Sequence, residues 1–316
     1  MEHRRRRLGR TDLEVFPLDL GGNVFGWTAD RQASFAVLDA YVAAGGNFVD
    51  TADVYSKWVA GHRGGESEEM LGAWLRERRG TEMIVATKVG MGGPLLEAGL
   101  SAAQIRTACE GSLRRLKVER IDLYYAHVDD PKTPLEESLG AFDALVREGK
   151  VRWLGASNHG ATRLREALDT SARLGLARYE VVQPKYNLLA RGDFEGAQAE
   201  LCIAEGLGVC TWHALASGVL TGKYDPDLPP EGSRAKGAAT YLAHPRIRDV
   251  LGALRTVAAR HRATPVQVAL AWLLARPAVT APIASATSAA QLEEQLGALR
   301  LELTAEDLEA LDAASS

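Results

Sequence analysis

The sequence contains no apolar stretch of the 18 or more residues that a membrane-spanning helix requires. Cysteine is also scarce: Cys109, Cys202 and Cys210 are odd in number and stand in apolar surroundings. Such cysteines are typical of buried thiols in a reducing compartment rather than of a disulfide framework. We therefore expect a cytoplasmic protein without a membrane span.

The sequence also lacks a strong excess of charge of either sign, with 37 Lys and Arg against 41 Asp and Glu and a formal net charge of −4. This balance gives no indication of a nucleic-acid partner. The one basic cluster, Arg4 to Arg7, is followed by no apolar segment of the kind that a secretory signal carries, and we interpret it as solvated. We expect no nucleic-acid or membrane partner, and the sequence does not indicate the oligomeric state.

What the sequence does contain is a regular alternation of short apolar runs with longer amphipathic segments. The runs are rich in β-branched and aromatic residues and end at Gly, Pro or polar residues, which is typical of buried strands. There are eight, at residues 16–22, 47–52, 83–89, 121–128, 151–157, 179–184, 208–212 and 279–285. Between them stand helix start signals, including capping boxes at Ser101 and Thr264 and a cap at Thr304.

Eight consecutive strand and helix units predict parallel strands joined by right-handed crossovers, and eight such strands close into a barrel. No Gly-x-Gly-x-x-Gly motif follows a strand, since the glycines of residues 90–94 have the wrong spacing, so a Rossmann sheet is disfavoured. The sequence predicts one α/β domain over residues 1–316, a single-domain (β/α)8 TIM barrel. An extra helix is expected near residues 246–262, before the seventh barrel helix, a short C-terminal helix after Thr304, and one long irregular loop at residues 225–237.

Polar side chains stand at the carboxyl ends of the predicted strands, where a barrel of this kind carries its chemistry. Asp50, Lys88 and His127 each end a run, and Tyr55 follows Asp50 by five residues. Taken singly, each has an ordinary interpretation as a turn cap, a solvated strand end, a buried histidine or loop packing. Together, an acid, a phenol, an amine and an imidazole at one barrel mouth indicate an active site.

This set suits proton transfer to a carbonyl oxygen. Lys88 would be costly to bury unpaired, and Asp50 is its expected partner. The ammonium would lower the pKa of Tyr55, which could then act as a general acid, while His127 would donate a hydrogen bond to the same oxygen. An alternative is a Schiff base on Lys88, as in an aldolase-like barrel enzyme.

Several spaced motifs carry a family resemblance over nearly the whole chain. These motifs resemble those of the aldo-keto reductases, and most closely those of the bacterial and potassium-channel β-subunit-like branch. They are residues 50–55 (DTADVY), 86–88 (ATK) and His127, together with 8–11, Gly22, 65–68, 155–158, 183–187 and 291–294. The resemblance implies an NAD(P)H-dependent oxidoreductase that reduces aldehydes and ketones by hydride transfer. It also leaves open a cofactor-sensing interaction module with weak turnover.

The resemblance further implies which residues hold the cofactor. They are Gly22, Asn23, Asp50, Ser157, Asn158, Gln183, Trp212, His213, Leu215, Ser217, Lys223, Arg234, Ser285, Thr287, Gln291, Glu294 and Gln295. The chain departs from the family at His213-Ala214, where Ser-Pro is frequent, at Thr287, where Arg is common, and at Gln295, where Asn is usual. Loss of that Arg weakens the case for the 2′-phosphate of NADP, but Lys223 and Arg234 supply charge, so NADP(H) is expected ahead of NAD(H).

The expected substrate pocket is apolar. Trp27, Tyr55, Trp58, Met91 and Val128 are its candidate walls, and the connection after His127 is short, so the pocket should be open. Such a lining suits a small hydrophobic aldehyde or ketone. Ordinary packing is the alternative interpretation of each of these residues.

Overall fold

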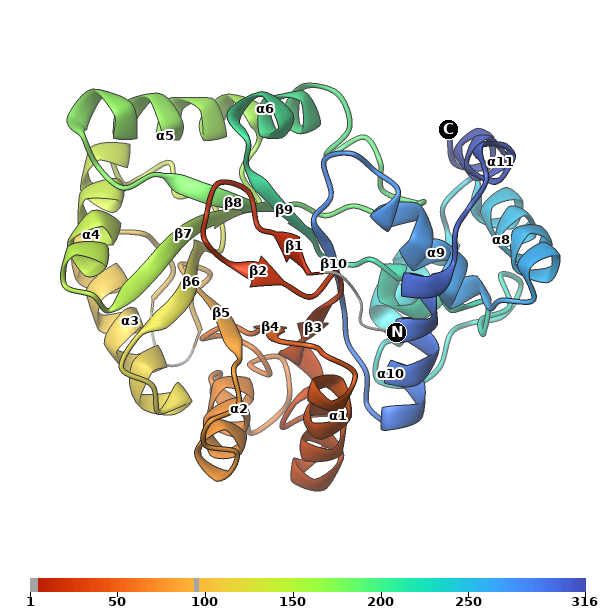
Figure 1. Ribbon diagram of the computed structural model, residues 1–316, viewed down its shortest axis with the longest axis horizontal. Coiled ribbons are helices and arrows are strands. Elements are labelled where there is room, and N and C mark those ends of the chain that lie inside the picture. Colours follow the sequence, from red (N-terminus) through yellow and green to blue (C-terminus); the bar gives the residue numbers. More distant parts are fainter. Residues whose placement is uncertain (1–4, 94–96) are drawn as a thin grey trace.

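The computed structural model describes residues 5–93 and 97–316, so Arg4 of the basic cluster and Pro94 of the glycine segment lie outside the described residues. Eight parallel strands close into a barrel, which confirms the predicted (β/α)8 fold (Figure 1). In barrel order they are β3 (Asp19–Gly21), β4 (Phe48–Asp50), β5 (Ile84–Val89), β6 (Ile121–Ala126), β7 (Val151–Ser157), β8 (Tyr179–Gln183), β9 (Gly208–Thr211) and β10 (Ala281–Ala284), which pairs with β3.

Each strand lies within one of the eight predicted apolar runs, because a strand covered on both faces needs apolar residues throughout. The side chains that point inward form a second core inside the barrel, which includes Phe48, Leu123 and Val181. A close approach across this interior requires Gly155: a Cβ there would lie 2.4 Å from the Tyr125 ring. The β7–β8 register shifts next to it, between Leu154 and Gly155.

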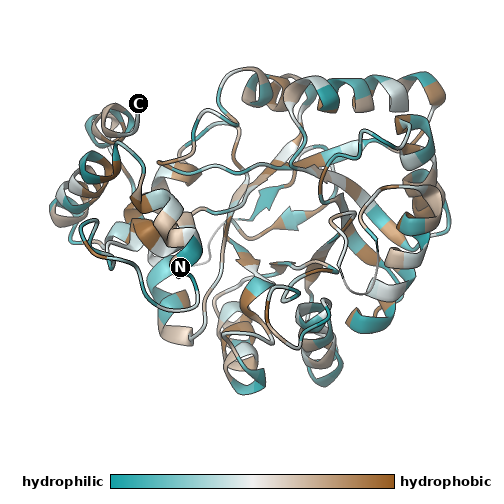
Figure 2. Cartoon of the chain, turned by 180° about the vertical axis from the view of Figure 1, so that it is seen from behind, coloured by the Kyte–Doolittle hydropathy of each residue, from teal (hydrophilic) through white to brown (hydrophobic). Residues whose placement is uncertain are grey.

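Helices surround the barrel and pack their apolar stripes against it, and Figure 2 shows hydrophobic and hydrophilic residues alternating along these helices. The barrel helices are α1 (Arg31–Ala43), α2 (Glu66–Glu77), α3 (Ala102–Leu116), α4 (Leu135–Arg147), α5 (Ala161–Leu174), α6 (Ala197–Glu205), α9 (Pro265–Leu274) and α10 (Ala289–Leu296). The predicted capping boxes open α3 at Ser101 and α9 at Thr264, and Thr304 caps α11 (Ala305–Ser315) in the same way.

Two extra helices precede α9, where the sequence predicted one. α8 (Ile247–His261) is the predicted helix, but α7 (Ala235–Leu242) begins inside the segment expected to be irregular, so the bounds predicted for that loop were wrong. The eight residues of α7 are too short to give a clear helical period, although Ala238 and Tyr241 bury one face of it.

A hairpin of β1 (Arg6–Arg7) and β2 (Glu14–Val15) was also not predicted, since strands of two residues leave no alternating pattern. In Figure 1 it lies across the middle of the ring of helices. Leu8, Leu13 and Val15 pack into the inner core of the barrel. The hairpin therefore closes the end of the barrel opposite the carboxyl ends of the strands.

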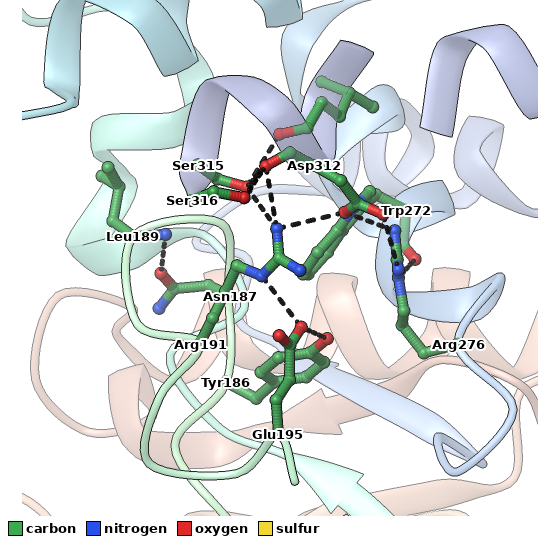
Figure 3. A network of polar contacts seen from close by, with 11 residues as sticks. Tyr186, Asn187, Leu189, Arg191, Glu195, Trp272, Arg276, Asp312, Ser315 and Ser316 are labelled. Carbon is green, nitrogen blue, oxygen red and sulfur yellow. Dashed lines mark hydrogen bonds and ion pairs between the residues drawn. The ribbon is translucent and has the colours of Figure 1, made fainter. Parts of the chain in front are cut away.

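The C-terminal helix α11 is tied to the loop after β8 by a polar network (Figure 3). Asp312 accepts hydrogen bonds from the Trp272 indole and from two nitrogens of Arg276, and it forms an ion pair with Arg191 at 3.2 Å. Arg191 also donates to the Ser315 hydroxyl at 2.8 Å. One carboxylate therefore holds α9, α11 and this loop together.

The three cysteines are free and buried, as predicted. Within residues 5–93 and 97–316, no helix is both long and apolar enough to cross a membrane. The same residues contain no cluster of His, Cys, Asp or Glu that could hold a metal ion.

Candidate active site

A cleft of about 530 Å³ opens at the carboxyl ends of the barrel strands. Strand ends supply its floor, and the segment after β9, which includes the 3-10 helix η2 (Ala216–Thr221), supplies one side. The lining residues include Gly21 from β3, Asp50 from β4, Ser157 from β7 and Gln183 from β8. The rule that places barrel chemistry at this end therefore locates the site.

Lys88, Asp50 and Tyr55 form one hydrogen-bonded group at the bottom of the cleft. Lys88 Nζ donates to Asp50 Oδ2 at 2.6 Å, to the Thr51 carbonyl at 2.7 Å and to the Tyr55 hydroxyl oxygen at 2.8 Å. The Tyr55 hydroxyl in turn donates to Asp50 Oδ2 at 3.0 Å. Lys88 is completely buried, so this ammonium is held in one geometry, with an acceptor for each of its three protons.

The pKa of Tyr55 corrects one expectation. Burial raises it well above the ordinary value, and the carboxylates of Asp50 and Asp19 raise it further. The expectation of a lowered pKa was wrong, because burial and the adjacent Asp50 carboxylate outweigh the Lys88 ammonium, which favours the phenolate. Tyr55 therefore carries its proton at neutral pH and can donate it.

His127 lies across the cleft from Tyr55, with the ring centroids 6.1 Å apart. Burial lowers the pKa of His127 well below its ordinary value, and Lys88 and Lys57 lower it further. The imidazole is therefore neutral, and its Nδ1 atom has no hydrogen-bond partner among the described residues. A neutral ring of this kind can donate one hydrogen bond to a ligand oxygen.

Three polar side chains form the floor beside Asp50. Gln183 Nε2 donates to Asp50 Oδ1 at 2.8 Å, and Ser157 Oγ donates to the Gln183 carbonyl at 2.9 Å. Asn158 Nδ2 donates to the His127 carbonyl at 2.8 Å. The side-chain oxygens of Asn158 and Gln183 accept no hydrogen bond from any described residue, so both remain open to a donor such as a carboxamide.

Trp212 and His213 form the wall after β9. His213 has a left-handed backbone, with φ of 58°, and its ring lies 4.6 Å from the Trp212 ring. Its Nδ1 atom is 2.9 Å from the Tyr241 hydroxyl of α7. Burial lowers the pKa of His213 to about 4, with Arg234 and Lys185 adding to the effect, so the ring is neutral at neutral pH.

Two cations on the far side of the cleft have no carboxylate partner among the described residues. Lys223 Nζ lies 4.9 Å from the Tyr224 ring, and Arg234 stands 5.9 Å from the Trp27 ring with no ion pair. Unpaired cations that line a cleft indicate an anionic ligand. The N-terminus of α10 faces the same space and is capped by Ser288, whose hydroxyl accepts from the Gln291 amide.

The structure brings most of the predicted site residues to this cleft. Those that line it are Asn23, Asp50, Tyr55, Trp58, Met91, His127, Ser157, Asn158, Gln183, Trp212, His213, Leu215, Ser217, Lys223, Arg234, Ser285, Thr287, Gln291, Glu294 and Gln295. Lys88 lies directly beneath the lining. Gly22, Trp27 and Val128 do not line it: Trp27 instead packs edge-on against Trp58, with ring centroids 5.6 Å apart.

Several lining residues were not predicted. They are Gly21, Val24, Thr28, Ala214, Gly218, Thr221, Ser233, Val266, Ile283 and Ala284. Gly21, Ile283 and Ala284 fall inside predicted strands, so the strand-end rule could have included them. Gly21 has a steric reason as well, because a Cβ there would lie 2.5 Å from Ser285 Oγ.

Comparison with known proteins agrees with this geometry. A family model described as the aldo/keto reductase family matches residues 17–316. A probable voltage-gated potassium channel subunit beta of Arabidopsis thaliana is 34% identical over 304 residues, covering 93% of this chain and 90% of its own. An uncharacterized oxidoreductase, YrpG, of Bacillus subtilis (strain 168) is 34% identical and covers 96% and 94% of the two chains. An aryl-alcohol dehydrogenase of Pestalotiopsis microspora is 30% identical over 315 residues, which is 95% of this chain and 79% of its own.

Proposed function

The chain belongs to the aldo/keto reductase family, and we propose that it is an NADP(H)-dependent reductase of aldehydes and ketones in which Tyr55 is the general acid. The observation that carries this proposal is the position of Lys88 Nζ, within hydrogen-bonding distance of both Asp50 and the Tyr55 hydroxyl at the bottom of the cleft. A reduced nicotinamide supplies a hydride to the carbonyl carbon when it is bound.

The chain's own residues account for the proton. A carbonyl oxygen placed between Tyr55 and His127 accepts a hydrogen bond from the neutral imidazole and then the proton of the phenol. As the C=O bond becomes a C–O single bond, the Tyr55 O–H bond breaks and a phenolate remains. Lys88 stabilises that phenolate at 2.8 Å, while Asp50 pairs with the ammonium and orients it.

The polar atoms that are still free fit the cofactor. Asn158 and Gln183 would accept hydrogen bonds from the carboxamide, and Trp212 would lie against the nicotinamide ring. Gln295, whose buried Oε1 atom has no partner among the described residues, would face the adenosine. The unpaired Lys223 and Arg234 would contact the phosphates, and these two cations are the reason to propose NADP(H) ahead of NAD(H).

Two alternatives receive less support. A Schiff base needs a free, neutral amine, but all three protons of the buried Lys88 ammonium have acceptors. A cofactor-binding module with weak turnover is the second alternative, and it is favoured by relatives named as potassium channel β subunits.

The decisive experiment is a titration with NADPH and with NADH, followed by a panel of aldehydes, ketones and quinones with absorbance read at the reduced-nicotinamide band. We expect tighter binding of NADPH and consumption of it with at least one hydrophobic carbonyl compound. Tight binding without turnover on the whole panel would support the module, and equal affinity for both cofactors would contradict the preference for NADP(H).

A further inference from the structure

A third aspartate, Asp19, lies inside the barrel below the Asp50–Lys88 pair. It stands in β3 opposite Ile283 of β10, while Gly21, two residues further along β3, stands opposite Asp50 of β4. Alternation along the strand therefore places Asp19 one layer deeper than Asp50 on the inner face. The side chain is completely buried among the apolar residues that fill the barrel.

The Asp19 carboxyl group has no partner that could hold it as an anion. Neither oxygen has a hydrogen-bond partner among the described residues. The titratable or charged groups that interact electrostatically with it are Asp50 of β4, Lys88 of β5, Tyr125 of β6, Cys210 of β9, Tyr41 of α1 outside the barrel and, above the layer, Tyr55. Of these, only Lys88 is cationic, and its three protons already have other acceptors.

An uncharged Asp19 is the state with the lower electrostatic cost. Burial raises the pKa of Asp19 well above its ordinary range, and the neighbouring Asp50 raises it further. Lys88 and the backbone N–H of Asp50 lower the pKa by less, and that N–H does not reach hydrogen-bond geometry. A buried carboxylate beside another carboxylate, with no free counter-ion, keeps its proton.

We propose that Asp19 is a positioning residue for proton transfer: as a buried neutral acid it leaves Asp50 and Lys88 as a balanced pair, and on ionising it holds the proton on Tyr55. This inference rests on the proposed function of Tyr55 as general acid. Formation of the Tyr55 phenolate adds one negative charge to the site. That charge is opposed only by Asp50 while Asp19 is neutral, but by two carboxylates once Asp19 has ionised.

The charge state can be tested without any cofactor. An aspartate in the unfolded chain has a pKa of about 3.9, and the pKa of Asp19 in the folded protein is higher. Between these two pKa values the folded protein holds a proton that the unfolded chain has lost. This group therefore makes stability fall as pH rises from about 4 to the folded pKa. Urea unfolding between pH 5 and 9 should show a weaker fall for Asp19→Asn and Asp19→Leu than for the wild type, and parallel curves would overturn the proposal.

The effect on Tyr55 is tested by the pH profile of kcat for the reverse reaction, alcohol oxidation, in which Tyr55 must first lose its proton. Both neutral replacements should move the rise in activity to lower pH by roughly one pH unit, because at the alkaline pH where Tyr55 loses its proton they remove the charge of the ionised Asp19 that opposes the phenolate. Asp143→Asn, a change in a buried aspartate of α4 outside the barrel, is the matched control and should leave the profile in place.

The possible outcomes separate charge from packing. A similar shift in both Asp19 variants supports the proposal, whereas a rate change that is uniform across pH, or a shift in only one variant, overturns it. If the wild-type protein oxidises no alcohol and reduces no carbonyl compound, the proposed function fails instead. The unfolding curves then still decide whether Asp19 is a neutral buried acid.

Discussion

Lys88 Nζ lies 2.8 Å from the Tyr55 hydroxyl oxygen, and both groups contact the same oxygen of Asp50. A single buried carboxylate therefore orients the amine and the phenol together. Removal of each member of this group has a distinct expected outcome.

Tyr55→Phe should lower kcat by about 100-fold to 10,000-fold, since it removes the general acid and leaves the ring in place. Affinity for NADPH should stay within about twofold, because the residues proposed to bind the cofactor are unchanged. Steady-state kinetics and a fluorescence titration measure the two quantities. A large loss of NADPH affinity with turnover preserved would contradict the role of Tyr55.

Lys88→Met should both inactivate and destabilise the protein, because it leaves Asp50 buried without a counter-ion. Breaking a buried pair in this way costs about 3–5 kcal/mol of unfolding free energy. The double variant Lys88→Met/Asp50→Asn should recover part of that stability but no activity. Urea denaturation and assays of both variants provide the test, and equal stability of the single and double variants would show that charge is not the cause.

Asp53 should make stability depend on pH. Burial, together with the nearby Glu68, raises the pKa of Asp53 to about 7, whereas that of an unfolded aspartate is about 3.9. The folded protein thus keeps a proton that the unfolded chain loses, and the contribution of Asp53 to stability falls between about pH 4 and pH 7 and then levels off, apart from the separate fall expected from Asp19. Asp53→Asn removes this fall and should gain a few kcal/mol at pH 8, an order-of-magnitude value from about three pKa units.

The matched control for Asp53 is Asp169→Asn, because Asp169 is an exposed residue of α5. Urea unfolding from pH 4 to pH 8 should show the same slope for this control as for the wild type. If Asp53→Asn also keeps the wild-type slope, Asp53 does not hold the proton.

Tyr241→Phe should loosen α7 and weaken cofactor binding. The change removes the 2.9 Å contact between the Tyr241 hydroxyl and His213, which joins α7 to the cleft wall. Arg234 stands at the start of α7, so its position depends on this helix. The same change removes the hydrogen bond that Asn187 Nδ2 donates to the Tyr241 hydroxyl at 3.4 Å. Loss of the two hydrogen bonds, of about 1 kcal/mol each, predicts a rise of about tenfold or more in the Kd for NADPH and faster proteolysis of residues 225–242. Tyr179→Phe is the control, since the Tyr179 hydroxyl makes no hydrogen bond with a described residue.

The barrel and the principal site residues could be predicted from the sequence alone. Strands buried on both faces must be apolar throughout, so runs such as 83–89 and 121–128 can be recognised as strands in the sequence. Capping residues mark the starts of the helices between them. The chemistry of a barrel lies where its strands end, so Asp50, Lys88 and His127 could be assigned to one cleft before any contact was known. These are local signals, which is why they were predicted.

Features that depend on contacts between residues far apart in the chain could not be predicted and are visible only in the folded structure. The direction of the Tyr55 pKa shift follows from burial and from the carboxylates of Asp50 and Asp19, which come from two different strands. The contact of His213 with Tyr241 likewise depends on how α7 packs against the cleft wall. The position of Asp19 deep inside the barrel depends on the register of β3 with β10. Burial shifts a pKa through the residues that surround the group in the folded protein, and the spacing of residues along the chain does not show which residues these are.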